Sequence, residues 1–147
     1  MATEQDLEPL LSNQQEHVGF LLDQSDGIDT KALAILAINI ALLIFIAQSE
    51  SVPGGFWWGA LLYGPFVASL VLNGFAIWPR RYDSVGVNLD KYPDYLSMDR
   101  DSLLLQLLAD TERVISNNTY TNSLRMRYCI ISILLTALGT VVLFAIL

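Results

Sequence analysis

Residue types that carry out catalysis are scarce in this sequence of 147 residues, which contains one histidine and one cysteine. We interpret His17 as a surface or packing residue, because no metal ligand lies at the usual helical spacing from it. Four carboxylates follow one another along a polar connector without a partner base: Asp83, Asp90, Asp94 and Asp99. No phosphate-binding glycine loop or Gly-x-Ser-x-Gly elbow is present. We therefore expect no enzyme, no metal site and no cofactor.

Three polar residues, Asn39, Asn73 and Thr136, lie deep inside otherwise apolar runs. A rise of about 1.5 Å per helical residue places all three roughly 10 to 13 Å from the basic residues that flank their runs. An amide that faces lipid is costly, so we expect Asn39 and Asn73 to bind each other, Thr136 or a neighbouring subunit. This intramembrane layer either holds helices together, which we favour, or lines a constriction in an oligomer.

Basic residues offer candidate contacts for an anionic signal, namely Arg80, Arg81, Lys91 and Arg100. Arg80 and Arg81 also follow an apolar run directly, where positive residues anchor a span on the cytoplasmic side. The formal net charge is -7, and many of the acidic residues precede the first apolar run. Such an acidic chain is repelled by polyphosphate, so we expect no nucleic-acid partner.

The apolar residues are concentrated in three runs, and a hydrocarbon core of about 30 Å needs roughly 20 helical residues to cross it. The first two runs predict a transmembrane hairpin over residues 31–81, with spans at about 32–51 and 56–78. The third predicts a span over residues 128–147. All 8 Lys and Arg residues fall on one side of this arrangement. The asymmetry predicts a multi-pass inner-membrane protein with a cytoplasmic N-terminus and an outside C-terminus.

Proline interrupts the second predicted span at Gly64-Pro65. Pro65 removes one backbone hydrogen bond and clashes with the preceding turn, which predicts a kink. We therefore regard Pro65 as a candidate hinge.

The segments outside the predicted spans also favour helices. Residues 1–30 form an amphipathic pattern in which apolar positions recur at alternating steps of four and three. We expect Asp26 and Gly27 to end this helix and Asp29 to cap the next one. Residues 82–127 contain a linker and then a helix capped by Ser97 or Asp99.

No Gly or Pro separates that last helix from the third span, so we expect one long cytoplasmic helix that continues into the membrane. The predicted fold class is therefore an all-α membrane protein. It has three transmembrane helices, an N-terminal amphipathic helix and a long helix leading into the last span.

The entry Asp29-Thr30-Lys31-Ala32 and the order of these elements resemble the transmembrane effector family of Pycsar-type antiphage systems. The resemblance implies an oligomeric inner-membrane effector that permeabilises the membrane in response to a cytoplasmic signal. It also implies membrane lipid, further copies of the chain, and a cyclic nucleotide or cytoplasmic protein as partners. Family members that sense cyclic pyrimidine nucleotides carry a separate nucleotide-binding module, and no segment here is long enough to be one.

Two alternatives remain open at this point. The chain could be a small structural subunit that docks a partner through its amphipathic helices. A transporter or channel fragment ranks last, because the spans contain no charge and no repeated half.

Overall fold

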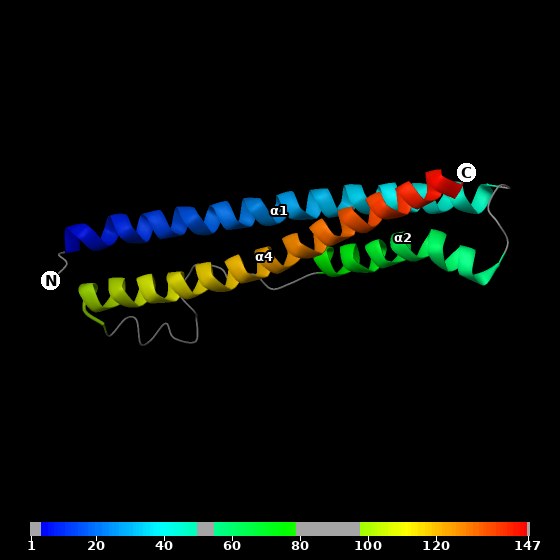
Figure 1. Ribbon diagram of the computed structural model, residues 1–147. Coiled ribbons are helices and arrows are strands. Elements are labelled where there is room, and N and C mark those ends of the chain that lie inside the picture. Colours follow the sequence, from blue (N-terminus) through cyan, green and yellow to red (C-terminus); the bar gives the residue numbers. More distant parts are fainter. Residues whose placement is uncertain (1–3, 50–54, 79–97, 147) are drawn as a thin grey trace. The chain divides into compact units, whose positions relative to one another are not determined.

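A computed structural model describes residues 4–49, 55–78 and 98–146, and these residues fold into helices without a strand among them (Figure 1). Helix α1 spans Glu4–Gln48, α2 spans Phe56–Ile77 and α4 spans Arg100–Ile146. All three are long and apolar enough to cross a membrane. The predicted all-α fold class is therefore confirmed.

Helix α1 continues through Asp26 and Gly27, so the predicted break at these residues is wrong. One glycine inside a helix costs about 1 kcal/mol relative to alanine, which packing on either side can offset. Ser25 and Ile28 are both buried and keep the spacing of the buried face. Because the helix does not begin again at Asp29, this carboxylate is not an N-cap.

Helix α4 begins at Arg100 and runs without interruption to Ile146, as the absence of breakers predicts. Asp99 caps it, since the backbone N–H of Ser102 donates to Asp99 Oδ2 over 3.3 Å. Hydrogen bonds from the side chain and then the backbone of Ser102 lower the pKa of the Asp99 carboxyl below its ordinary value. Ser97, the other predicted cap, lies outside the described residues.

The chain divides into two compact units. The pair unit comprises residues 1–25 and 80–122, and its described part pairs the beginnings of α1 and α4. Arg100 forms an ion pair with Glu8, and Asn122 Nδ2 donates to the Leu21 carbonyl over 2.8 Å. Both contacts advance along the two helices in the same direction, so the helices are parallel here.

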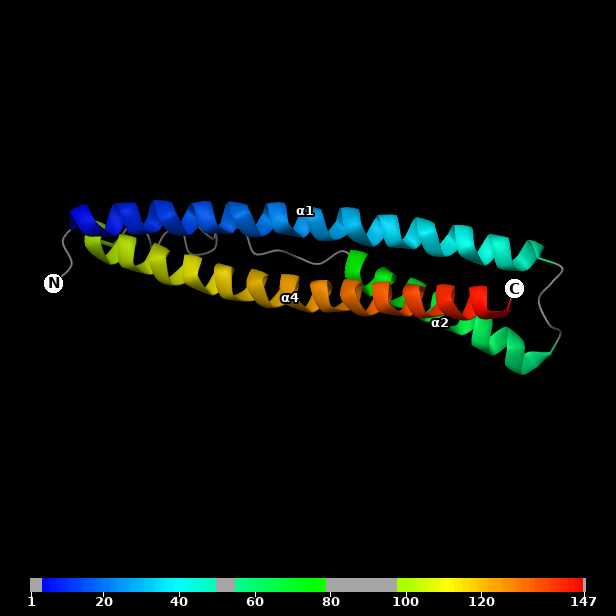
Figure 2. The same cartoon turned by 45° about the horizontal axis from the view of Figure 1, so that its top comes forward.

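The bundle unit comprises residues 26–79 and 123–147, and it contains the end of α1, all of α2 and the end of α4. Its segments of α1 and α4 are parallel and α2 is antiparallel to both, as Figure 2 shows in cyan, orange to red, and green. Buried positions on each helix alternate in steps of four and three, which is the spacing of knobs-into-holes packing. On α2 these positions are Leu62, Phe66, Ser69, Asn73 and Ala76.

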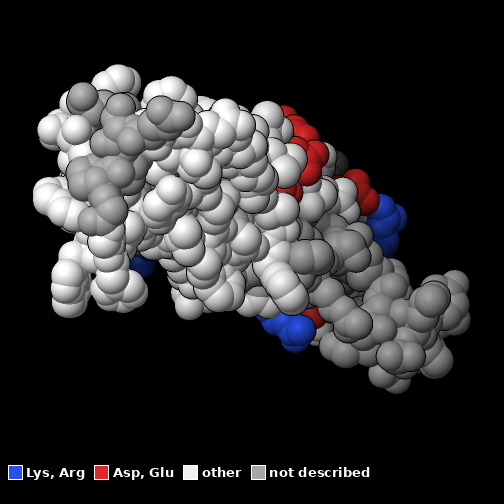
Figure 3. Space-filling model, turned by 90° about the vertical axis from the view of Figure 1, so that its right-hand side faces the viewer, with Lys and Arg blue, Asp and Glu red and all other residues white. Residues whose placement is uncertain are grey.

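The bundle unit is apolar on the outside. Its described charged residues lie only within 26–31 and 125–127, which we call the charged end. The opposite end, where α1 stops, is called the far end, and the described side chains nearest the viewer there are uncharged (Figure 3). Large apolar side chains face outward on all three helices, including Phe45, Val71 and Leu134. A surface of this kind suits a lipid environment.

Candidate functional site: a layered core in the bundle unit

A hydrogen-bonded network joins all three helices in the middle of the bundle unit. Thr136 Oγ1 on α4 donates to Asn39 Oδ1 on α1 over 2.9 Å, and Asn39 Nδ2 donates to Ser69 Oγ on α2 over 2.8 Å. Ser69 Oγ also lies 2.5 Å from Ser132 Oγ and 2.9 Å from Thr136 Oγ1. We call these four residues the polar network. Asn39, Ser69 and Ser132 are completely buried within it.

Every hydroxyl proton of the polar network has an acceptor within reach. Ser69 Oγ can donate to the Ser132 carbonyl over 3.0 Å, while Ser132 Oγ donates to the Ser69 carbonyl over 3.1 Å. This reciprocal pair joins α2 to α4, and the Thr136 proton remains for Asn39. Interhelical hydrogen bonds inside membranes contribute about 0.6 to 2 kcal/mol each, so the network stabilises the packing of the three helices.

Asn73 is as buried as Asn39 but takes no part in the polar network. It lies one turn after Ser69 on the same buried face of α2 and is 0% exposed. Neither Nδ2 nor Oδ1 of Asn73 has a hydrogen-bond partner among the described residues. A buried polar group without a partner costs about 1 to 3 kcal/mol. The structure therefore brings Asn39 and Thr136 together and gives the Asn73 amide no hydrogen bond within its described part.

Between the polar network and the far end, the core closes in a cluster of apolar side chains. We call Ile46, Leu62, Phe66 and Leu143 the apolar plug. Gly139 on α4 makes room for the Phe66 ring, because a Cβ atom at position 139 would lie 2.8 Å from Phe66 Cζ. An alanine at this crossing of α2 and α4 would therefore require the Phe66 ring to move.

Pro65 lies inside α2, directly before Phe66 of the apolar plug. The helix continues on both sides of the proline from Phe56 to Ile77. The role of Pro65 as a hinge remains a prediction.

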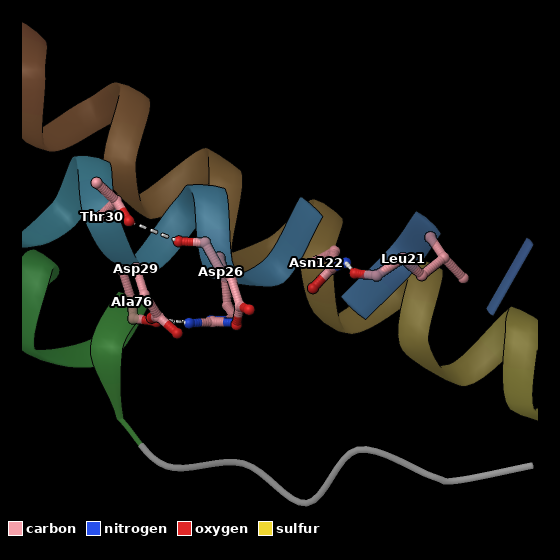
Figure 4. A network of polar contacts seen from close by, with 7 residues as sticks. Leu21, Asp26, Asp29, Thr30, Ala76 and Asn122 are labelled. Carbon is pink, nitrogen blue, oxygen red and sulfur yellow. Dashed lines mark hydrogen bonds and ion pairs between the residues drawn. The ribbon is translucent and has the colours of Figure 1, made fainter. Parts of the chain in front are cut away.

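At the charged end, Arg125 connects α4 to the other two helices. Its Nε donates to the Ala76 carbonyl over 2.6 Å, and its guanidinium forms an ion pair with Asp29 (Figure 4). The Arg125 side chain is 3% exposed and that of Asp29 is 39% exposed. Ala76 belongs to the last turn of α2, whose carbonyls have no partner within the helix, so Arg125 satisfies one of them. We call this arrangement the charged clamp.

Buried polar residues also occur in the pair unit. Asn122 is 2% exposed and donates to the Leu21 carbonyl, as Figure 4 shows. Thr111 and Asn118 are buried to the same extent on α4. In the pair unit α4 therefore has buried polar residues in addition to the buried Leu104.

Only one of the four candidate signal contacts lies in the described part of the chain. Arg100 is exposed at the start of α4 and pairs with Glu8, which is also exposed. Arg80, Arg81 and Lys91 lie outside the described residues. Their role in binding a signal stays a prediction.

Sequence reasoning missed two residues of this core. Ser69 has little effect on hydropathy, and its position four residues before Asn73 is the only indication that it faces the same way. Arg125 was counted as one of the cations that orient the chain, although it is buried against Asp29. The two opposite charges border the first and third spans on the same side, which is the signal that could have suggested their pairing.

Three apolar helices that pack around a core with a central polar network, with the charge of the bundle unit's described residues confined to one end, define a multi-pass membrane domain. The Pycsar effector protein domain, PycTM, matches residues 15–147. The chain therefore belongs to the Pycsar effector family, which confirms the resemblance based on the Asp29-Thr30-Lys31-Ala32 entry. No curated protein and no solved structure matched the chain.

Proposed function

We propose that this Pycsar effector oligomerises in the inner membrane and permeabilises it when a cytoplasmic signal arrives. In this proposal the N-terminus is cytoplasmic, the C-terminus is outside, and the chain catalyses no reaction. The observation that carries the proposal is the layered core of the bundle unit. The polar network lies between two apolar clusters of this core, namely Ile28, Ala32, Ala76 and Cys129 toward the charged end and the apolar plug toward the far end.

The composition of this core supports a change between closed and open packing. Water can replace the hydrogen bonds that Ser69, Ser132 and Thr136 make in the closed bundle. The Asn73 amide, which has no partner within the described residues, gains hydrogen bonds on hydration. Hydrophobic constrictions close pores by excluding water, which is the role we assign to the apolar plug.

The two long helices offer a route for the signal. α1 and α4 each continue from the pair unit into the bundle unit without a break. A signal that alters the packing of the pair unit therefore acts on helices that also carry Asp29 and Arg125 of the charged clamp. The partners in this proposal are membrane lipid, further copies of the chain, and a cyclic nucleotide or cytoplasmic protein as the signal.

Reconstitution tests the proposal directly. The protein is purified in detergent, its oligomeric mass is determined, and it is inserted into dye-loaded vesicles. Cyclic CMP, cyclic UMP or cytosol from phage-infected cells is then added. We expect an oligomer and release of dye in at least one arm, and Phe66→Ala, which shortens the apolar plug, should leak without a signal. A monomer that leaks in no arm and does not slow bacterial growth on induction contradicts the proposal.

A further inference from the structure

Polar and small side chains follow the buried face of α4 through most of the bundle unit. Arg125, Cys129, Ser132, Thr136 and Gly139 lie along it, and all except Thr136 are buried outright. Thr140 extends the stripe and donates from Oγ1 to the Thr136 carbonyl over 2.8 Å. From Arg125 to Thr140 the face covers roughly 22 Å at 1.5 Å per residue. That is about three quarters of a hydrocarbon core of about 30 Å.

The other two helices offer much shorter polar surfaces to the core. On α2 only Ser69 and Asn73 contribute, and they are one helical turn, or roughly 6 Å, apart. On α1 the buried polar contribution between Lys31 and Gln48 is Asn39 alone. The described part of the bundle unit therefore has one helix, α4, whose polar and small buried side chains extend along about three quarters of the hydrocarbon core. Within this stripe Cys129 packs in the apolar cluster with Ile28, Ala32 and Ala76.

The opposite face of α4 is suited to lipid. It consists of large apolar residues that are 46% to 67% exposed, namely Ile130, Ile131, Ile133, Leu134, Leu138 and Val141. A transmembrane helix with one apolar and one polar face is the kind that separates lipid from water in an assembly of several copies.

We infer that α4 lines the water-filled path of the open effector, with Ser132 and Thr136 in its wall and Arg125 at its charged end. In the closed bundle α1 and α2 cover this face, and the Phe66 ring occupies the space at Gly139. On opening, α2 leaves Gly139, and the α4 faces of several copies meet water. The Asn73 amide lies in the same core, is fully buried and has no hydrogen-bond partner among the described residues. It is an independent sign that polar groups of this interior can bind water.

This inference rests on the proposed function and adds to it the helix and the face that water contacts. If the stripe only held the helices together, its side chains would remain inaccessible to water while the membrane leaks. Accessibility of single cysteines during leakage distinguishes the two roles. The native thiol, Cys129, lies on the stripe and is first removed as Cys129→Ser.

Two matched pairs of cysteine variants are compared on the Cys129→Ser background. Thr136→Cys and Ser132→Cys place a thiol on the stripe, while Leu134→Cys and Ile131→Cys place one on the lipid face at nearly the same depth. Ser132→Cys is conservative, so it keeps the test valid if Thr136→Cys fails to fold. The vesicles are treated with a membrane-impermeant, cationic methanethiosulfonate reagent with and without the nucleotides or cytosol, and also in the Phe66→Ala background.

We expect the thiols at positions 132 and 136 to be labelled at least tenfold faster in leaking vesicles than in sealed ones, and labelling to slow the release of dye. The thiols at positions 131 and 134 should stay unlabelled in both. Leakage without labelling at 132 and 136, or with equal labelling of both faces, overturns the inference while the proposed function stands. Vesicles that remain sealed in every arm, including Phe66→Ala, contradict the proposed function itself.

Discussion

The Phe66 ring lies where a side chain at position 139 would have to be placed, with only 2.8 Å between Phe66 Cζ and a Cβ atom built on Gly139. Real Cβ atoms essentially never come so close to another heavy atom, so any other residue at position 139 would require the Phe66 ring to move. Phe66 therefore has two roles, because its ring fills the space at Gly139 and also belongs to the apolar plug.

Gly139→Ala should destabilise the bundle unit. Overpacking a well-packed core costs about 1 to 3 kcal/mol, which exceeds the gain of up to about 1 kcal/mol from replacing a helical glycine. Gly74→Ala is the control, because a Cβ atom there has nothing within 4 Å. Thermal unfolding in detergent, followed by circular dichroism, should give a lower Tm for Gly139→Ala and an unchanged or higher one for Gly74→Ala. Equal Tm values for the two variants would show that Phe66 does not need the glycine.

The two buried asparagines should respond to leucine in opposite directions. Asn39→Leu removes one hydrogen-bond partner each from Ser69 and Thr136 and should lower the stability of the closed bundle by about 1 to 3 kcal/mol. Asn73→Leu removes an amide that has no partner among the described residues, so it should leave stability unchanged or raise it. Unfolding in detergent measures both, and dye release should need less signal in Asn39→Leu and more in Asn73→Leu. Equal losses of stability would mean that Asn73 has a partner.

Arg125→Gln should weaken the charged clamp. The substitution leaves the Asp29 carboxylate without its ion pair and the Ala76 carbonyl without its donor. Breaking a buried pair costs about 3 to 5 kcal/mol, and the partial exposure of Asp29 places this case at or below the lower limit. Arg127→Gln is the matched control, since Arg127 is exposed two residues away and surface substitutions usually stay within about 0.5 kcal/mol. A Tm for Arg125→Gln as high as that of the control would show that the charged clamp does not stabilise the bundle unit.

Asp99 should make the start of α4 sensitive to acid. Because the folded state lowers the pKa of this carboxyl, its stabilising effect is fully present above the ordinary pKa and is lost as the pH falls through the lowered value. Helix content measured by circular dichroism should therefore decrease in that acidic range. Asp99→Asn keeps a capping side chain without the titration, whereas Asp99→Ala loses the cap at every pH. The same acid response in Asp99→Asn and the wild type would assign the effect to other carboxyls.

The lengths of the apolar runs and the positions of helix-breaking glycine and proline residues were sufficient to predict much of the fold. Three spans, the all-α class and the continuous α4 helix follow from them, since a membrane imposes one length and one backbone solution on each apolar run. The break at Gly27 was predicted wrongly because local propensity is weak against the packing of residues on both sides, such as Ser25 and Ile28. Tertiary contacts can override such a signal.

The polar core was harder to predict than the helices. Asn39 and Thr136 were expected to meet because they share a depth, and depth follows from sequence alone. Rotation of each helix about its axis does not follow in the same way, so Ser69 was overlooked. Among the described residues Asn73 makes no hydrogen bond to Asn39 or Thr136, and a partner in a neighbouring subunit stays a prediction. The ion pair of Asp29 with Arg125 depends on the same rotations.

The parallel direction of α1 and α4 in the bundle unit has an electrostatic consequence. A helix carries roughly half a positive charge at its N-terminus and half a negative charge at its C-terminus. At the far end, α1 and α4 both present C-termini while α2 presents an N-terminus, which leaves about half an elementary negative charge per copy. In the proposed oligomer these helix dipoles would add, so the far end would attract cations and repel anions without an ionised side chain of the described residues there.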